Sequence, residues 1–242
     1  MSILPLDRSL LRRRLAALAR KGVYIGTSSW KYEGWLGQVY TPGRYHTRGR
    51  FSSAKFEREC LSEYAEFFKT VCVDGAYYSF MSEKQLQELG DQVPDDFRFA
   101  FKVTEEITVK RYPSLPRYGQ RGGTVNAHFL SASLFNERFL GPLAVLREKA
   151  GPIIFEFSQF SPGEFSKSAP FLEALDLFFS SIPKGYSYCV ELRNEGWLDP
   201  DYLSILSKHR VAHVYNSWTR MPPVSEQRRI VGELDTDELS VA

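Results

Sequence analysis

A regular alternation of short apolar segments with longer amphipathic ones is the feature that most constrains the fold of this 242-residue chain. The short segments are rich in Val, Ile, Phe and Tyr, as buried strands are, and each is followed by apolar residues at helical spacing. Such an alternation is typical of βα units on a parallel sheet. The strand-like segments are residues 23–30, 71–80, 97–104, 152–158, 186–193 and 211–218.

Capping residues help to place the helices between these strands. Leucines recur near helical spacing up to Gly22, which predicts an N-terminal helix within residues 1–22. Ser52 and Ser53 offer an N-cap for the next helix, which carries an apolar and aromatic face. Later helices are predicted around Leu134 to Leu146, over residues 169–183 and over residues 199–210.

Two sheet architectures fit this order of elements, an open doubly wound sheet and a (β/α)8 barrel. A doubly wound nucleotide-binding fold usually has G-x-G-x-x-G after its first strand, whereas this chain has GTSSW. We therefore predict an α/β fold of the TIM-like (β/α)-barrel type, formed by one domain over residues 23–242. About six strands are clear and residues 219–242 offer only RRIVGEL as a weak seventh, so we expect a barrel that is truncated at its C-terminus.

Composition limits the compartment and the partners. The chain has 31 basic and 29 acidic residues, and a formal net charge of +2 gives a nucleic-acid partner no support by itself. Its three widely spaced cysteines indicate a reducing compartment and argue against a disulfide framework or a structural zinc site. No segment has the apolar length of a signal peptide or a spanning helix, so we expect a cytoplasmic protein without membrane contact.

Polar residues within the predicted strands share one parity. Alternate residues of a strand point to opposite sides, and in a barrel one of these sides faces the interior. Apolar neighbours occupy the other parity, so the polar groups should converge near the C-terminal ends of the strands, where barrel enzymes carry their sites. The converging residues are Asp74, Lys102, Glu156, Glu191 and Arg193.

These three acids and two bases have two interpretations. One is a buried network in which they neutralise one another and stabilise the fold. The other is a polar pocket, with Glu191, Glu156 and Asp74 as candidate catalytic acids or bases and with Lys102 and Arg193 holding an anionic or hydroxyl-rich ligand. Both interpretations predict burial, but only the second predicts an open cavity of ligand size.

Aromatic residues follow several of the predicted strands. We predict that Trp30, Tyr78 and Trp197 form walls of the pocket on which a flat or sugar-like ligand stacks, and that Asn216 is a further ligand contact. For any single ring, packing in the core or in a lid is the commoner role.

No nucleophilic triad, metal site or cofactor is predicted. The chain has no G-x-S-x-G motif, and Cys189 is interpreted as an inert buried cysteine. The i, i+4 pair of His209 and His213 straddles a predicted helix end and a strand, so the two rings need not share a face. A carboxylate-held Mg²⁺ or Mn²⁺ at the predicted acids stays an open alternative.

Five ordered blocks of the sequence resemble a known family, the YecE-like proteins or domain of unknown function 72, over about residues 23–218. The blocks are GTSSWKYEGWLGQVY, YAEFFKTVCVDGAYYSF, FRFAFKVTEEITVKRYP, GPIIFEFSQFSPGEF and VELRNEGW. The resemblance implies a TIM-barrel-like fold. It implies no reaction, since the family's biochemical activity is not established.

The chain departs from the usual residues of that family. Cys72 and Asp74 stand where members commonly have a glutamate and an asparagine, Glu156 replaces a common glutamine, and Asn194 replaces a frequent histidine. The family's last segment, an aromatic strand followed by a final helix, has no counterpart here. The resemblance therefore implies a partly rearranged set of acids and a barrel that lacks one wall.

Two functions follow as hypotheses. The first is an enzyme that acts on a sugar-like or phosphoester-like ligand at the C-terminal ends of the strands. The second is a noncatalytic module whose aromatic rim engages a nucleic acid or a protein. Replacing Glu191 by Gln separates them, since only the enzyme would lose turnover while keeping its ligand. The open sheet edge of a truncated barrel also predicts self-association.

Overall fold

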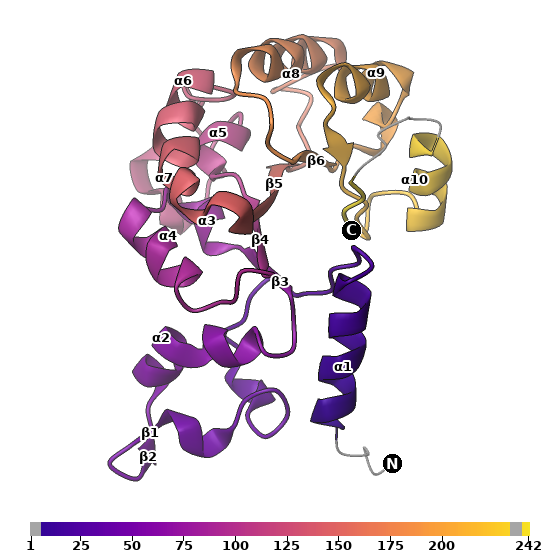
Figure 1. Cartoon of the computed structure of the whole chain (residues 1–242). Helices are drawn as coiled ribbons and strands as arrows, with labels where there is room; N and C mark the ends of the chain where they lie inside the picture. The colour runs from indigo at the N-terminus through magenta and orange to yellow at the C-terminus, as the bar shows by residue number, and fades with distance from the viewer. Residues whose placement is uncertain (1–5, 233–238) are drawn as a thin grey trace. The chain divides into compact units, whose positions relative to one another are not determined.

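The computed structural model describes residues 6–232 and 239–242, which divide into two compact units (Figure 1). Unit 1 contains the described residues up to 74 together with residues 82–100 and 143–151. Unit 2 contains residues 75–81 and 101–142 and the described residues from 152 onward.

A five-stranded parallel sheet gives the chain its α/β fold. The strands lie in the sheet in the order in which they occur along the chain, β3-β4-β5-β6-β7. In the pairing of β5 with β6, Glu156 lies opposite Glu191, so two acidic residues occupy neighbouring positions of the sheet. The strands are β3 (Thr70–Val73), β4 (Arg98–Lys102), β5 (Ala150–Phe157), β6 (Tyr188–Leu192) and β7 (Ala212–His213).

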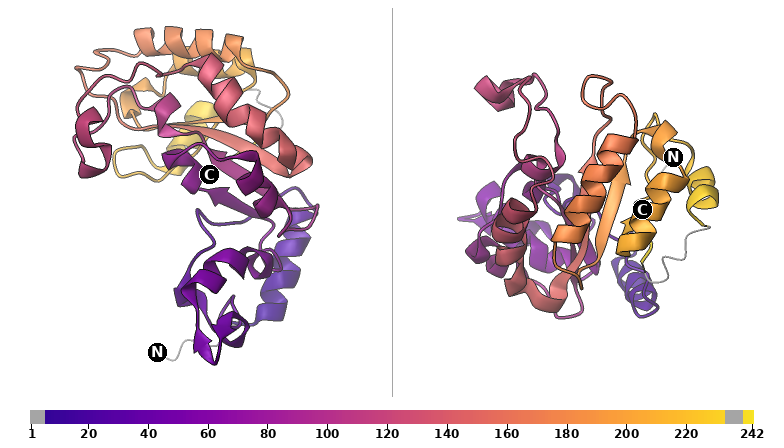
Figure 2. Two further views of the ribbon diagram at one scale, coloured as in Figure 1. Left: turned by 90° about the vertical axis from the view of Figure 1, so that its left-hand side faces the viewer. Right: turned by 90° about the horizontal axis from the view of Figure 1, so that it is seen from above.

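Unit 2 has an aromatic core beside β5 and β6. The ring centroid of Phe155 lies 5.2 Å from that of Phe135 and 5.3 Å from that of Phe178. Tilted and edge-on pairs of this kind add about 0.5–1.5 kcal/mol each to the area they bury. Figure 2 shows α8 and α9 side by side along the sheet. The α-helices wholly within unit 2 are α3 (Gly75–Tyr78), α5 (Glu105–Thr108), α6 (Ala132–Phe135), α8 (Ala169–Ser181), α9 (Pro200–His209) and α10 (Val224–Val231).

Unit 1 is organised around a buried glutamate. Glu63 accepts hydrogen bonds from the Thr41 hydroxyl (2.6 Å), the Tyr45 hydroxyl (2.7 Å) and the Arg8 guanidinium (3.1 Å). Burial raises the pKa of Glu63, but the hydrogen bonds from Thr41 and Tyr45 outweigh this effect and hold the pKa below its usual value. The main elements of unit 1 are α1 (Arg8–Ala19), the hairpin of β1 (His46–Thr47) and β2 (Arg50–Phe51), α2 (Ser53–Tyr64) and α4 (Glu83–Gly90).

The predicted helix ends in unit 1 are confirmed. The Ser52 hydroxyl caps α2 by accepting a hydrogen bond from the Lys55 backbone N–H (3.3 Å). After α1 ends, Gly22 adopts a φ of +80°, in the left-handed region that favours glycine.

The first predicted strand and the weak seventh strand are wrong. Residues 23–30 form no strand; the Thr27 carbonyl accepts one hydrogen bond from the Cys72 N–H (2.9 Å), and one such bond does not make a ladder. Residues 228–231 of the RRIVGEL segment lie in α10, because the residues that α10 buries, Gln227 and Val231, recur at helical spacing. Residues 233 and 234 of the segment lie outside the described residues.

The sheet of the described residues is not closed into a barrel, and β3 and β7 are its two ends. Just beyond β7, Val241 bridges Val214 in parallel, and the Tyr215 N–H donates to the Val241 carbonyl (2.9 Å). Part of this edge is therefore already paired, and self-association through the edge stays a prediction. Within the described residues, no helix combines the length and the apolar character needed to cross a membrane.

Candidate functional site

Two carboxylates on neighbouring strands of unit 2 share one guanidinium. Arg193 follows β6, and its Nη2 lies 2.6 Å from Oε1 of Glu191 and 3.1 Å from Oε2 of Glu156. Its Nε donates a second hydrogen bond to the same oxygen of Glu191 (2.8 Å). Charge-assisted bonds of this length are among the stronger polar contacts in proteins, so the arginine holds the two acids in a fixed relation.

Lys102 extends this group to four residues, which we call the ion-pair cluster: Lys102, Glu156, Glu191 and Arg193. The Lys102 Nζ lies 2.7 Å from Oε2 of Glu156. The carboxylate side chains are 8% and 9% exposed, whereas those of Lys102 and Arg193 are 23% and 22% exposed. The acids are thus the more buried partners, and a partly exposed cationic surface lies over them.

Asn216 connects the end of β6 with the tryptophan beside Arg193. Its side-chain amide donates to the Leu192 carbonyl (3.2 Å), and its side-chain oxygen accepts a hydrogen bond from the backbone N–H of Trp218 (3.2 Å). The Arg193 guanidinium lies 5.9 Å from the ring centroid of Trp218. Asn216, predicted as a ligand contact, therefore uses its amide to position the backbone of this site.

Tyr77 is a further polar group near the cluster, and it is half-buried. Burial raises the pKa of its phenol, and the negative charges of Glu156 and Glu105 raise it further. The phenol therefore stays protonated and can donate a hydrogen bond.

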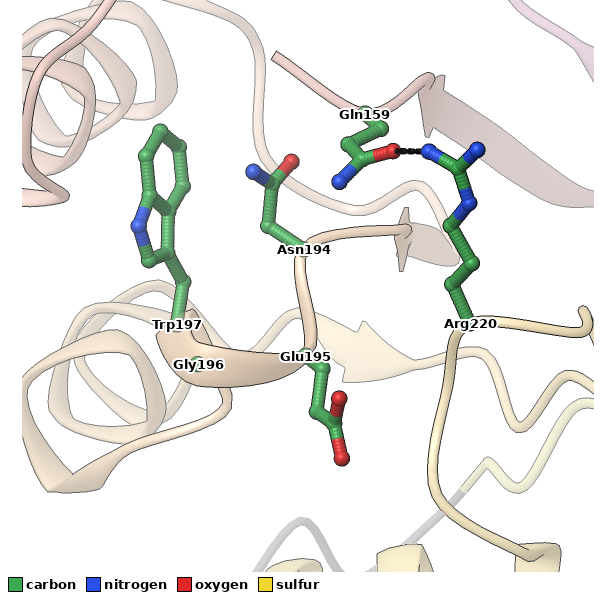
Figure 3. Close-up of a pocket in the computed structure, with 6 residues that line it drawn as sticks. All are labelled: Gln159, Asn194, Glu195, Gly196, Trp197 and Arg220. Atoms are coloured by element: carbon green, nitrogen blue, oxygen red, sulfur yellow. Dashed lines mark hydrogen bonds between the residues drawn. The ribbon is translucent and has the colours of Figure 1, made fainter. Parts of the chain in front are cut away.

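A pocket of about 450 Å³ opens where β5 and β6 end (Figure 3). This volume is within the range of small-molecule sites, roughly 300–1,000 Å³. In Figure 3, Trp197 lies on one side and the hydrogen-bonded pair of Gln159 and Arg220 on the other, with Asn194 between them. The lining residues are Gln159, Asn194, Glu195, Gly196, Trp197 and Arg220.

Packing holds two of the lining residues in place. Trp197 stacks on Phe160 and on Phe171, with ring centroids 5.6 Å and 5.7 Å apart. The Asn194 side-chain oxygen accepts a hydrogen bond from the Phe160 N–H (3.0 Å), which connects the loops after β5 and β6. One wall of the pocket is therefore rigid before a ligand arrives.

The structure brings together some of the predicted site residues. Four of them form the ion-pair cluster, Trp197 lines the pocket, and Asn216 lies between the two, while the ligand-binding or catalytic role of each stays a prediction. Trp30 and Asp74 belong to unit 1. Trp30 is buried there and its carbonyl accepts a hydrogen bond from the Tyr40 hydroxyl, whereas Asp74 contacts the Cys72 sulfur (3.8 Å).

Tyr78 contacts other residues of unit 2. The Arg117 guanidinium lies 5.0 Å from the centroid of its ring, and Tyr77 packs edge-on against it (5.3 Å). Its predicted role as a pocket wall stays untested by these contacts.

Sequence reasoning predicted Trp197 and missed the other lining residues, Gln159, Asn194, Glu195, Gly196 and Arg220. Gln159, Asn194 and Arg220 lie in loops, and Glu195 and Gly196 lie in a short 3-10 helix (Glu195–Trp197), where the alternation that fixes side-chain direction in a strand does not apply. For Gln159 and Asn194 the sequence still held a usable signal, because each follows the last residue of a strand by two positions. In parallel α/β folds, ligands bind just beyond the carboxyl ends of strands.

The described residues also bear on the metal and cysteine hypotheses. Among residues 6–232 and 239–242, no group of three or more His, Cys, Asp or Glu side chains is placed to hold a metal ion. Cys189 is fully buried and burial raises the pKa of its thiol, which disfavours the reactive thiolate.

Comparison with known proteins gives one family. The family described as "Protein of unknown function DUF72" matches residues 24–234. No curated protein matches the chain.

Two solved structures are similar to this chain. The structure of a DUF72 family protein from Enterococcus faecalis aligns with a TM-score of 0.52 and 20% identity, covering 82% of this chain and 64% of that protein. A DUF72 family protein from Thermotoga maritima gives a TM-score of 0.51 and 18% identity over 83% of this chain and 68% of that protein. The match thus spans about two thirds of these relatives, and at such identities the likeness concerns the fold.

Proposed function

This chain belongs to the DUF72 family, and we propose that its unit 2 binds a small polar ligand of the sugar or phosphoester class where β5 and β6 end. The observation that carries the proposal is the pocket, which combines an indole wall at Trp197 with the Arg220 guanidinium and the Glu195 carboxylate. An apolar face with a few convergent polar groups is the usual composition of a small-molecule site.

Two guanidinium groups over one tryptophan ring support an anionic group on the ligand. Arg193 directly precedes the pocket residue Asn194 in the chain, and both Arg193 and Arg220 lie over the Trp218 ring, 5.9 Å and 5.6 Å from its centroid. A phosphate near these two guanidinium groups would form charge-assisted hydrogen bonds.

The proposed activity is acid or base catalysis on that ligand, with Glu191 and Glu156 of unit 2 as the candidate groups. Glu191 is the first candidate, because it lies at the end of β6 and next to the partly exposed Arg193. Tyr77, whose raised pKa keeps its phenol protonated, supplies a hydrogen-bond donor in the same unit and not a general acid.

A specific observation also favours a noncatalytic binding protein. One oxygen of Glu191 accepts two hydrogen bonds from Arg193, and Glu156 contacts both Lys102 and Arg193. Carboxylates that are paired in this way serve structure as readily as catalysis.

We also propose that the sheet belongs to a TIM-like (β/α) barrel over residues 23–242, which residues 1–22 precede. The strictly sequential order β3-β4-β5-β6-β7 supports this proposal, because doubly wound sheets reverse their strand order at a switch point and barrels do not.

Isothermal titration with glucose 6-phosphate tests the proposed ligand class, because this probe combines a hydroxyl-rich ring with a phosphate. We expect saturable binding that Arg220→Gln and Trp197→Leu each weaken by roughly tenfold or more, since each loses a direct contact. Arg229→Gln, which removes the same charge from α10, should leave the affinity unchanged. The absence of binding, or equal effects of Arg220→Gln and Arg229→Gln, would contradict the proposal.

Glu191→Gln separates the enzyme from the binding protein. With 4-nitrophenyl phosphate and 4-nitrophenyl glucoside as chromogenic probes, an enzyme should lose turnover in this variant and still bind glucose 6-phosphate. A binding protein should show no turnover before or after the substitution.

A further inference from the structure

A hairpin that follows α5 in unit 2 carries a second candidate site. We call residues 110–126 the arm. The Tyr112 N–H donates to the Thr124 carbonyl (3.0 Å), and the Asn126 N–H donates to the Lys110 carbonyl (3.0 Å), which is antiparallel pairing. Figure 2 shows this segment projecting from the body of its unit. The arm is thus an ordered protrusion with a defined backbone.

The base of the arm is fixed by one buried side chain. The Asn126 amide donates to the backbone carbonyls of Glu106 and Val109, at 2.8 Å each. Its side-chain oxygen accepts a hydrogen bond from the His128 N–H (2.9 Å). These bonds anchor both ends of the hairpin to the preceding helix, so the arm can present side chains in a constant arrangement.

The arm has only positive formal charges. Between residues 110 and 126 the sequence has no Asp or Glu, and it has four cationic residues, Lys110, Arg111, Arg117 and Arg121. This local charge contrasts with the formal net charge of +2 for the whole chain. An anionic partner is the complement of such a surface.

Two acids of α5 form ion pairs with arginines of the arm. Arg117 Nη2 lies 3.2 Å from Oε2 of Glu105, and Arg121 Nη1 lies 3.0 Å from Oε2 of Glu106. The arginine side chains are 44% and 56% exposed, whereas those of the glutamates are 10% and 25% exposed. The acids therefore orient the guanidinium groups, and the surface that solvent meets is mainly cationic.

Aromatic rings and these guanidinium groups form one chain of contacts, in the order Tyr78, Arg117, Tyr118, Tyr112 and Arg121. Arg117 lies between two tyrosines, 5.0 Å from the ring centroid of Tyr78 and 4.7 Å from that of Tyr118. The Tyr118 ring lies 5.5 Å from that of Tyr112, over which Arg121 lies at 4.8 Å. We call these five side chains the ladder. At one end of the ladder Tyr78 is 59% exposed.

We propose that the arm binds single-stranded nucleic acid. A single strand combines flat bases with phosphates, and the ladder offers an exposed tyrosine ring, Tyr78, beside the partly exposed guanidinium groups of Arg117 and Arg121. Tyr112 and Tyr118 are buried and support these guanidinium groups from within. Bases stack on tyrosine rings and on guanidinium planes, and phosphates pair with arginine. An acidic protein segment would satisfy the cations but would leave the exposed Tyr78 ring without a stacking partner, so the ladder favours the nucleic acid.

This inference is independent of the proposed sugar or phosphoester site, because it uses none of the residues that line that pocket. Its test is fluorescence anisotropy with a labelled thymidine oligonucleotide of about 20 nucleotides, titrated at about 50 mM and about 150 mM KCl. We expect binding that weakens with salt. The triple variant Arg111→Gln, Arg117→Gln, Arg121→Gln should bind about tenfold or more weakly, with a salt slope smaller by about two.

Matched variants separate charge from stacking. Arg13→Gln, Arg14→Gln, Arg20→Gln removes the same charge from exposed positions of α1 or its C-terminal end, and should change the affinity less than about twofold. Arg117→Lys with Arg121→Lys keeps the charge but loses the flat guanidinium groups, so it should weaken binding while the salt slope stays constant. Tyr78→Leu should weaken binding about fivefold or more through lost stacking.

Several results would overturn the proposal. These are no binding of the oligonucleotide by the full chain at the lower salt, an equal loss in the α1 triple variant, or full affinity in both Tyr78→Leu and the lysine variant. Competition by poly-glutamate as effective as that by unlabelled oligonucleotide would assign the arm to acidic polymers in general. Thermal melting followed by circular dichroism shows whether each variant is folded, and the lysine variant keeps the test decisive if the glutamine variant is not.

Discussion

The guanidinium of Arg193 lies 2.6 Å from the carboxylate of Glu191, two positions earlier in the chain. Side chains two positions apart at the end of a strand point to the same side, so the Glu-x-Arg sequence places acid and base together without help from the rest of the fold. What the fold adds is Glu156 on the neighbouring strand, opposite Glu191 in register. The pair thereby becomes a cluster that spans two strands.

Loss of Arg193 should destabilise the protein strongly. Arg193→Met leaves two buried carboxylates without their shared partner, and we expect a decrease of about 2–4 kcal/mol in the free energy of unfolding. Urea denaturation at pH 7 measures it. The matched control is Arg229→Met, whose ion pair with Glu226 is exposed and should contribute less than about 1 kcal/mol. Equal stability of the two variants would show that the cluster does not stabilise unit 2.

Asn216 should act through the backbone that it holds. Asn216→Ala leaves the Leu192 carbonyl and the backbone N–H of Trp218 without this hydrogen-bond partner, which should lower the free energy of unfolding by about 1–3 kcal/mol. The maximum of the fluorescence emission of Trp218 should also shift. The same substitution in a Trp218→Phe background identifies which part of the fluorescence comes from Trp218. Unchanged emission together with unchanged stability would contradict the positioning role.

His213 should make the protein less stable in mild acid. Its ring lies between the Tyr202 hydroxyl (3.0 Å) and the Gln227 side-chain oxygen (3.4 Å), and burial lowers its pKa to about 4 from an ordinary value of 6.5. Between these values the unfolded chain binds a proton that the folded chain does not bind. Stability is therefore complete above pH 6.5 and falls as the pH decreases toward 4, by on the order of 3 kcal/mol.

Chemical denaturation at several pH values checks this dependence against His213→Gln, which cannot titrate. The difference in stability between wild type and variant should change between pH 6.5 and pH 4 and stay constant above that range. A difference that does not vary with pH would show that His213 is protonated in the folded protein as readily as in the unfolded chain.

Gly26 should tolerate no side chain. A Cβ at this position would lie 2.2 Å from the Thr70 carbonyl oxygen, a backbone atom that cannot move away cheaply. We expect Gly26→Ala to lower the unfolding free energy by about 1–3 kcal/mol or more. Gly34→Ala is the matched control, since nothing lies within 4 Å of its Cβ. Similar melting temperatures for the two variants would refute the close approach of this segment to β3.

The sequence predicted the parts of the fold that follow from periodicity. Strand alternation placed Glu156, Glu191 and Lys102 on one side, because burial on the other side fixes the direction of every second residue. The failures have local causes. Residues 23–30 have strand composition but share one hydrogen bond with β3, and α10 has a buried glutamine that no apolar pattern reveals.

The pocket was harder to predict than the cluster. Its polar residues Gln159 and Arg220 lie in loops whose directions depend on long-range contacts, such as the hydrogen bond between these two side chains across 61 positions of the chain. Glu195 begins a 3-10 helix of three residues. Loop geometry of this kind is determined by tertiary packing and has no periodic signal in the sequence. Trp197 was predictable because it lies only four positions after Arg193, just beyond the strand end.

The most direct test of a polar-ligand pocket in unit 2 is a titration with glucose 6-phosphate followed by the indole N–H signals in ¹H–¹⁵N NMR spectra. The chain has four tryptophans: Trp197 lines the pocket, Trp218 lies beside Arg193, and Trp30 and Trp35 belong to unit 1. We predict saturable shifts of the Trp197 and Trp218 signals and none of the other two. Shifts of Trp30 or Trp35 alone, or no shift of any indole signal, would contradict the proposed pocket.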